Sequence, residues 1–128
     1  MCRILVVDDQ AFMRSIVRSR IESQEGWKVC GEAPNGKEAI EQAKLLKPDL
    51  IILDIHMPFM NGFEAARQIL TLMPQMIILI VSIAGPIPFS KAAAHCGAKG
   101  YLIKSQVAEN LVLAVTALLR SETYFSHG

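Results

Sequence analysis

The feature that most constrains this chain is an unbroken apolar run, Leu-Ile-Ile-Leu at positions 50–53, that ends on Asp54. A strand with one solvated face alternates apolar and polar residues, whereas a continuous aliphatic run predicts a strand buried on both faces, as inside a parallel sheet. Asp54 then lies at the carboxyl end of that strand. Because ligands of open α/β sheets bind outside these ends, Asp54 is a candidate catalytic or ligand-binding residue.

Other apolar runs in the chain also stop at polar residues. The run at 3–7 stops at Asp8 and Asp9, the run at 76–81 at Ser82, and the short run at 100–103 at Lys104. A more polar run at 27–33 predicts a strand at the edge of the sheet. The chain therefore contains several candidate strands whose carboxyl ends carry acids, a hydroxyl or an amine.

Segments with apolar residues at helical spacing separate these runs and follow the last one. Strands that alternate with helices predict right-handed crossovers and a parallel sheet. We expect a single-domain α/β fold over residues 1–128, doubly wound as (βα)5 and flavodoxin-like, with strand order 2-1-3-4-5. That order places Asp8 and Asp9 beside Asp54 and adds Ser82 and Lys104 to the same edge.

Composition and charge exclude several classes of protein. The formal net charge of +1 provides no basic field for binding nucleic acid, and the three cysteines lack the C-x-x-C spacing of a zinc site. The N-terminus enters a strand pattern at once, without the regions of a signal peptide. The longest apolar stretch, at 76–89, is too short to cross a bilayer. We expect a cytoplasmic protein with reduced thiols and no membrane contact.

Three carboxylates at one edge repel one another and favour a bound cation. Oxygen-only ligands suit Mg²⁺, which takes one or two protein carboxylates together with water and phosphate oxygens. An aspartate beside Mg²⁺ is a reasonable nucleophile towards phosphorus, and it forms an aspartyl phosphate. A lysine and a hydroxyl stabilise the charge of such a group. The predicted edge carries all of these groups.

Asp8, Asp9, Asp54, Ser82 and Lys104, together with the pattern D-x-x-M-P-x-x-N-G that begins at Asp54, resemble the CheY-like receiver domain of two-component response regulators. The resemblance covers essentially the whole chain. The predicted strand order, which is that of flavodoxin and CheY, rests partly on this resemblance.

The resemblance implies a role for each acid. Asp54 would accept a phosphoryl group from the phosphohistidine of a sensor histidine kinase. Asp9, the Asp54 carboxylate and the backbone carbonyl of His56 would hold Mg²⁺, and Asp8 would act through a metal-bound water. Such a domain catalyses its own phosphorylation and dephosphorylation only, so we do not expect an enzyme acting on other substrates.

The resemblance also implies a switch. Lys104 would pair with the phosphoryl oxygens, Ser82 would turn to hydrogen-bond one of them, and Tyr101 would change rotamer; Tyr101 as simple core packing is an equal alternative. Ile83 stands where the family has a small residue, and with His56 it is predicted to tune the lifetime of the phosphoryl group. Ser105 replaces the usual proline after Lys104, which predicts a trans peptide there.

The segments GEAPNGKEAI, GAKGYLIKS and LLRSETYF look like receivers of the NarL/FixJ subfamily of transcriptional regulators. Those proteins continue into a helix-turn-helix domain, which this chain does not contain. We therefore expect either the regulatory part of a transcription factor or a stand-alone receiver. DNA contact would need the absent domain, and a homodimer formed on phosphorylation remains open.

Other interpretations of the same residues stay open. Asp8 and Asp9 could cap the following helix, and Arg14, Arg18 and Arg20 are predicted to form a solvated face, with kinase contact as the alternative. A phosphohydrolase of the haloacid dehalogenase type needs a second aspartate where His56 stands. A flavin carrier of this topology needs a phosphate-binding loop in place of the acids after the first strand. A receiver-like interaction module without phosphorylation is a further alternative.

Overall fold

The computed structural model describes residues 1–83 and 86–125, with the side chains of 86–90 outside the described part. The strands are β1 (Cys2–Val7), β2 (Trp27–Ala33), β3 (Leu50–Asp54), β4 (Ile77–Ser82), β5 (Gly100–Ile103) and β6 (Tyr124–Phe125). The helices are α1 (Ala11–Glu22), α2 (Gly36–Leu46), α3 (Gly62–Leu72), α4 (Pro86–His95), the short 3₁₀ helix η1 (Lys104–Gln106) and α5 (Val107–Leu119).

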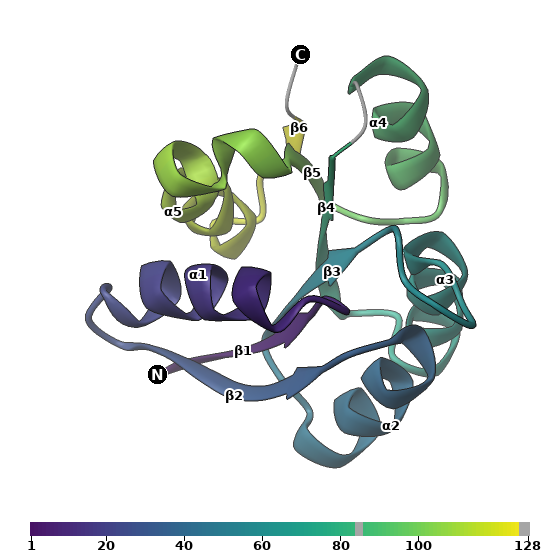
Figure 1. The fold of residues 1–128 in the computed structure, drawn as a ribbon, viewed down its shortest axis with the longest axis horizontal. Helices are drawn as coiled ribbons and strands as arrows, with labels where there is room; N and C mark the ends of the chain where they lie inside the picture. The colour runs from purple at the N-terminus through teal and green to yellow at the C-terminus, as the bar shows by residue number, and fades with distance from the viewer. Residues whose placement is uncertain (84–85, 126–128) are drawn as a thin grey trace.

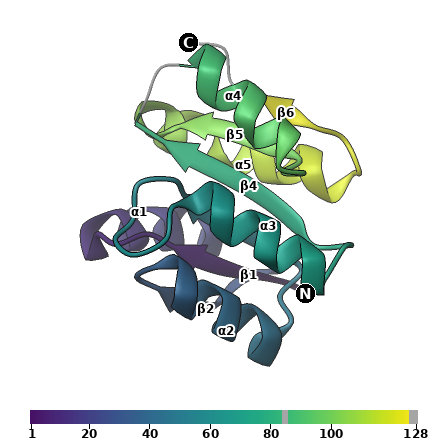
Figure 2. The ribbon, with the colours of Figure 1, turned by 90° about the vertical axis from the view of Figure 1, so that its right-hand side faces the viewer.

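The strands form one parallel sheet in the order β2-β1-β3-β4-β5-β6. Helices α1 and α5 cover one face, and α2, α3 and α4 cover the other (Figures 1 and 2). The predicted α/β fold and the order 2-1-3-4-5 are confirmed, with β2 at one edge. Because all strands run the same way, their carboxyl ends meet at one edge of the sheet.

Each face of the sheet has its own apolar core. All of β3 is buried, so its side chains alternate between the two cores. On the side of α2, α3 and α4 the core contains Leu5, Val7, Ile51, Leu53 and Tyr101. On the side of α1 and α5 it contains Ile4, Val6, Leu50, Ile52 and Leu102. The continuous apolar runs of the sequence therefore correspond to strands covered on both faces.

The sixth strand is a difference from the sequence-based expectation, which had left the segment after α5 as a tail. Tyr124 and Phe125 pair in parallel with Gly100 and Tyr101, and the Tyr124 N–H donates to the Lys99 carbonyl at 3.1 Å. A Cβ atom on Gly100 would lie 3.0 Å from the Tyr124 carbonyl oxygen, so the glycine permits the close approach. Two residues are too few to show a strand period, which is why the sequence did not reveal β6.

The remaining backbone observations agree with expectation. No cis peptide occurs among the described residues, so the Lys104–Ser105 bond is trans as predicted. None of the helices in the described ranges is long and apolar enough to span a bilayer.

Candidate functional site

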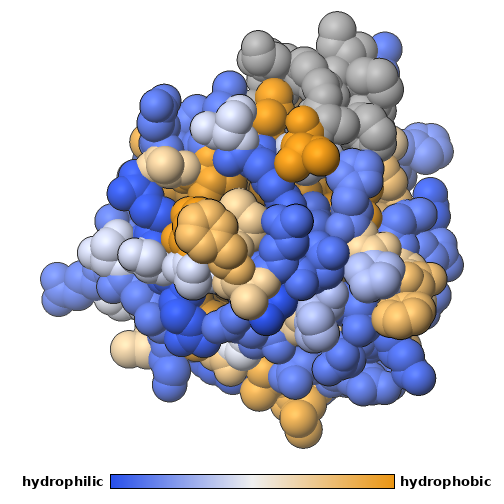
Figure 3. All heavy atoms as spheres, in the orientation of Figure 1, coloured by the Kyte–Doolittle hydropathy of each residue, from blue (hydrophilic) through white to orange (hydrophobic). Residues whose placement is uncertain are grey.

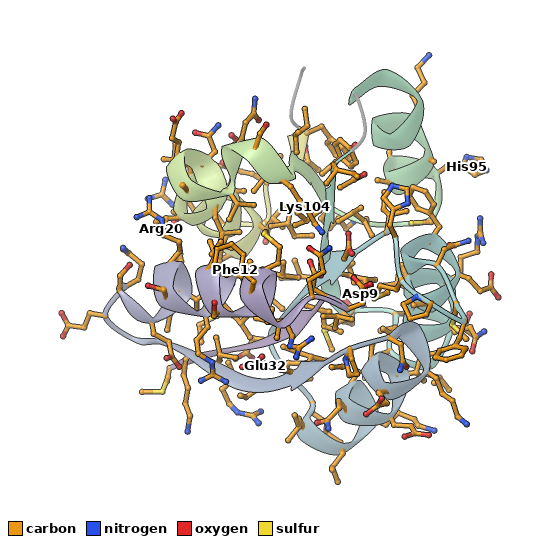
Figure 4. All side chains as sticks on the ribbon, viewed as in Figure 1. Asp9, Phe12, Arg20, Glu32, His95 and Lys104 are labelled. Atoms are coloured by element: carbon orange, nitrogen blue, oxygen red, sulfur yellow. The ribbon has the colours of Figure 1, made fainter. Side chains whose placement is uncertain are left out.

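The predicted polar residues meet at the carboxyl edge of the sheet. The Lys104 ammonium nitrogen lies 3.1 Å from Oδ2 of Asp8 and 3.4 Å from Oδ1 of Asp54. Asp8, Asp9 and Asp54 each place one carboxylate oxygen within 4.8 Å of the others. Figure 4 labels Asp9 and Lys104 in the central part of the view, over the ends of the strands. Residues from three strand ends thus form one cluster.

The backbone and the carboxylate of Asp8 both make several polar contacts. Its backbone N–H donates to the Ala33 carbonyl at 3.1 Å, and its own carbonyl accepts from Nη1 of Arg14 at 2.6 Å. Its Oδ1 accepts from the Gln10 N–H at 2.9 Å, while Oδ2 faces Lys104. The residue is 4% exposed. Asp8 is therefore a buried carboxylate with its orientation fixed.

Asp54 is buried as deeply, but its carboxylate is held less tightly. The residue is 1% exposed, and neither carboxylate oxygen has a hydrogen-bond partner of good geometry within the described residues. Burial, with the nearby charge of Asp8, raises the pKa of Asp54 to about 6, although Lys104 and the backbone N–H of His56 act to lower it. A buried carboxylate that lacks donors favours a cation or an added polar group beside it.

Lys104 is the cation shared by both acids. Burial acts to lower its pKa, but the hydrogen bond to Asp8 and the charge of Asp54 outweigh that effect, so the pKa of Lys104 is raised. The amine is therefore charged at neutral pH. It partly neutralises two neighbouring carboxylates and lies where it could also contact a further anionic group beside Asp54.

Ser82 and Tyr101 form a buried pair beside this cluster, and both side chains are fully buried. Burial raises the pKa of the Tyr101 hydroxyl, and a hydrogen bond with the Ser82 side chain partly offsets the increase. Tyr101 is thus both a core residue and the partner of the hydroxyl at the end of β4. Packing and switching are compatible at this position.

In the segment between β3 and α3, the N-G pair of the motif, Asn61 and Gly62, has a structural role. The Asn61 side chain caps α3 by accepting from the Glu64 N–H at 3.0 Å. The Gly62 N–H donates to the Ile55 carbonyl at 2.9 Å, and a Cβ atom on Gly62 would collide with the Asp54 carbonyl oxygen. Only glycine allows this approach, which fixes the main chain of the candidate acceptor.

Exposed apolar side chains occur close in sequence to three strand ends. The exposed fractions are 76% for Phe12, 92% for Phe59 and 70% for Ile83. Figure 3 shows one face of the molecule as mainly hydrophilic, with apolar residues in separate orange patches. His56, which follows Asp54 in the same segment as Phe59, is exposed as well. The segments that follow these strands therefore expose apolar side chains to solvent.

The sequence-based interpretation of Arg14 was wrong, whereas Arg18 and Arg20 lie on a solvated face as expected. Arg14 was assigned to a solvated face, but its side chain is 19% exposed and contacts both Asp8 and Glu32. Arg18 also pairs with Glu32, at 2.7 Å. The i, i+4 spacing of the two arginines was visible in the sequence, but their shared partner on β2 was not. Gln10, whose N–H holds Asp8, was likewise missed.

The acids fit a hard divalent cation. The ligand atoms are all carboxylate oxygens, which suits Mg²⁺ rather than zinc or another softer metal. The buried Asp54 carboxylate, which has no hydrogen bond of good geometry from the described residues, is a second reason to place a cation there. The role of the His56 carbonyl stays a prediction.

Comparison with known proteins agrees with this geometry. A family model described as the response regulator receiver domain matches residues 4–116. The chain is 42% identical to the chemotaxis protein CheY of Thermotoga maritima over 102 residues, which cover 80% of this chain and 84% of that protein. It is 32% identical to the response regulator GacA of Pseudomonas aeruginosa over 126 residues, 98% of this chain and 59% of that protein.

Solved structures give the same result. A two-component response regulator of the LuxR family from an Aurantimonas species superposes with a TM-score of 0.95 at 32% identity, covering 98% of this chain and 90% of that one. The response regulator domain of Thermotoga maritima CheB gives a TM-score of 0.84 at 35% identity, covering 91% and 94%. The chain spans 59% of the length of GacA, so that protein has a further segment that the match does not cover.

Proposed function

This chain belongs to the response regulator receiver family of two-component signalling, and on that premise we propose that Asp54 accepts a phosphoryl group from a sensor histidine kinase. The observation that carries the proposal is the state of the Asp54 carboxylate, which is buried and without hydrogen-bond partners of good geometry in the described residues. An oxygen with free lone pairs can attack phosphorus, whereas the oxygens of Asp8 are already engaged.

In the proposed reaction an Asp54 carboxylate oxygen forms a bond to phosphorus as the bond from phosphorus to the imidazole nitrogen of the kinase breaks. The electron pair stays on that nitrogen, which takes a proton from water. Lys104 lies 3.4 Å from Oδ1 of Asp54 and is therefore close enough to contact an oxygen of the transferred group. Its charge stabilises the aspartyl phosphate.

We assign Mg²⁺ to the acid cluster as the cofactor of this reaction. Asp9, Asp54 and the His56 backbone carbonyl would bind it directly, and Asp8 through a water molecule. When bound, Mg²⁺ neutralises negative charge that collects on the phosphoryl oxygens. Asp8 keeps its contact with Lys104, so the Asp8 carboxylate and the Lys104 amine hold each other in place.

Ser82 and Tyr101 are the proposed switch. The Ser82 hydroxyl is hydrogen-bonded to Tyr101, so turning it towards a phosphoryl oxygen would break or shift that bond. The change would reach β5 and the neighbouring face formed by α4, β5 and α5, with the α1 face as the other candidate for partner binding. His56 and Ile83 would tune how long the phosphoryl group survives, because both are exposed next to the site.

Transcriptional control is the proposed output, with a stand-alone receiver as the alternative. The chain is similar to the response regulator GacA and to a response regulator of the LuxR family, which supports a regulatory output. DNA binding would lie in another domain, and dimerisation would follow phosphorylation. A cytoplasmic location fits a kinase partner of this kind.

The proposal is tested by incubating the chain with acetyl phosphate and Mg²⁺ and measuring the intact mass. We expect one phosphoryl adduct, which requires Mg²⁺ and is lost in Asp54→Asn. An adduct that survives this substitution would exclude Asp54 as the acceptor. Release of phosphate from many small esters would instead favour a phosphohydrolase.

A further inference from the structure

We infer that Arg14 is a positioning residue for the metal site, acting on the backbone of Asp8 rather than on the metal or the phosphoryl group. The inference rests on the proposed assignment of Mg²⁺ to the acid cluster. The guanidinium of Arg14 divides its donors between two acceptors. Its Nη1 donates to the Asp8 carbonyl at 2.6 Å, and its Nε donates to Oε1 of Glu32 at 2.9 Å.

Glu32, on the edge strand β2, anchors Arg14. Oε2 of Glu32 accepts from Arg18 at 2.7 Å, so the two carboxylate oxygens bind two different arginines. Burial acts to raise the pKa of Glu32, but hydrogen bonds from Arg18 and Arg14 outweigh it and lower the pKa. Glu32 is therefore charged and the contacts are charge-assisted. The side chains of Arg14 and Glu32 are 19% and 30% exposed, so solvent screens this pair less than an exposed one.

The contact matters because Arg14 binds the backbone carbonyl of Asp8, whereas the carboxylate of Asp8 faces the site. The Asp8 N–H is bonded to Ala33 of β2, and the Asp8 carbonyl is bonded to Arg14, which is itself bonded to Glu32 of β2. Both backbone groups of Asp8 are thus tied to the neighbouring strand. Removing Arg14 leaves the carbonyl of a buried residue without this donor and lets its carboxylate move.

Whether Mg²⁺ binding weakens or tightens when Arg14 is removed distinguishes a positioning role from a simple effect of its charge. If Arg14 acted only as a nearby positive charge, removing it would make the acid cluster more negative and Mg²⁺ would bind more tightly. If Arg14 positions Asp8, removing it weakens binding. Partners that orient metal ligands typically contribute about 10- to 100-fold to metal affinity.

Arg20 is a matched control on the same helix. It lies on the other side of α1 from Glu32 (Figure 4), and it is exposed. Arg14→Gln and Arg20→Gln remove the same charge from α1. Only the first removes a contact to Asp8.

The experiment is a calorimetric titration of the full chain with Mg²⁺ alone. We expect about 10-fold weaker binding for Arg14→Gln, at the lower end of the range for such partners, and binding like the wild type for Arg20→Gln. Arg14→Lys keeps the charge but cannot bond both acceptors at once, so it should also bind weakly. Wild-type or tighter binding by Arg14→Gln, full rescue by Arg14→Lys, or no binding by the wild type would each overturn the inference.

Thermal melts without metal check that the variants fold. If Arg14→Gln does not melt cooperatively, Arg14→Lys serves instead, because it keeps the charge and loses one of the two contacts, so weaker Mg²⁺ binding by this variant comes from positioning and not from charge. The Asp54 adduct is measured separately at saturating Mg²⁺. Loss of the adduct from the wild type would therefore refute the proposed function, while the Mg²⁺ titration alone decides the role of Arg14.

Discussion

The ends of β1 and β3 lie side by side and both carry a buried aspartate, yet the two carboxylates have opposite surroundings. Asp8 has a donor at each carboxylate oxygen, from Gln10 and Lys104. Asp54 has no hydrogen-bond partner of good geometry at either oxygen within the described residues. Because both oxygens of Asp8 are engaged, they fit the proposed contact to the metal through water. The oxygens of Asp54 are more open to the metal ion and to phosphorus. The difference therefore separates two roles that the residue type alone does not distinguish.

The chain that follows each strand causes this difference. After β1 the chain turns directly into α1, so the Gln10 N–H reaches the Asp8 carboxylate. After β3 a longer segment intervenes, and α3 is capped by Asn61. The start of α3, at Gly62, packs against the main chain of Asp54. This arrangement fixes the position of Asp54 and leaves its carboxylate without a hydrogen bond of good geometry from the described residues.

Lys104 contacts both acids, so its loss should have the largest effect. In Lys104→Gln we expect phosphorylation by acetyl phosphate to slow by about 100-fold, as when one charged donor is removed from a catalytic site. Time courses of intact mass measure the rate. Lys99→Gln, at the opposite end of β5, is the control. Equal rates for the two variants would remove Lys104 from the mechanism.

The raised pKa of Asp54 predicts how stability depends on pH without metal. The pKa of Asp54 is about 6 in the folded protein and its ordinary value is 3.8, so between these pH values the folded state binds a proton that the unfolded state has released. Stability should therefore fall as pH rises from about 4 to about 6, because ionising Asp54 is costlier in the folded state.

Asp54→Asn removes this cost. At pH 8 in chelator, urea denaturation should show it to be more stable than the wild type by about 1–3 kcal/mol. Asp8→Asn is the comparison and should not be stabilising, because it loses an ion pair with Lys104. A less stable Asp54→Asn protein at pH 8 would contradict the contrast between the two acids.

Phe59, in the segment that follows β3, tests whether that segment is strained. Its φ is +72°, in the left-handed region that favours glycine, and its ring is 92% exposed. Phe59→Gly should stabilise the protein by about 0.5–1 kcal/mol in urea denaturation, because relief of strain exceeds the added freedom of the unfolded chain. Phe59→Ala loses the same ring but keeps Cβ, so it should change stability less. Equal effects of the two substitutions would argue against strain.

The smallest effect should come from Ile83, which follows Ser82 and is 70% exposed. Ile83→Ala should admit water to the phosphoryl group and shorten its lifetime on the order of threefold. Loss of the adduct after removal of acetyl phosphate measures the lifetime. Leu72→Ala, an exposed residue at the end of α3, is the control. A longer lifetime in Ile83→Ala would show that this side chain does not shield the site.

The sequence predicted the five main strands and the polar residues at their ends, because both depend on local patterns, whereas the predicted strand order also rested on the resemblance to receiver domains. Apolar runs predicted the strands, and polar residues at their ends predicted Asp8, Asp9, Asp54, Ser82 and Lys104. The pairing of Arg14 with Glu32 could not be predicted, since it joins a helix to an edge strand. The lack of well-formed hydrogen bonds to the Asp54 carboxylate within the described residues depends on how α1 and α3 enter the site. Strand β6 was too short to leave a pattern.

The central claim is that Asp54, and not its buried neighbour, carries the phosphoryl group. Borohydride reduces an aspartyl phosphate to homoserine, so reduction after treatment with acetyl phosphate and Mg²⁺ marks the acceptor. Digestion and tandem mass spectrometry then locate the mark. We predict homoserine at position 54, with Asp8 and Asp9 unchanged; homoserine at position 8 or 9, with position 54 unchanged, would contradict the account.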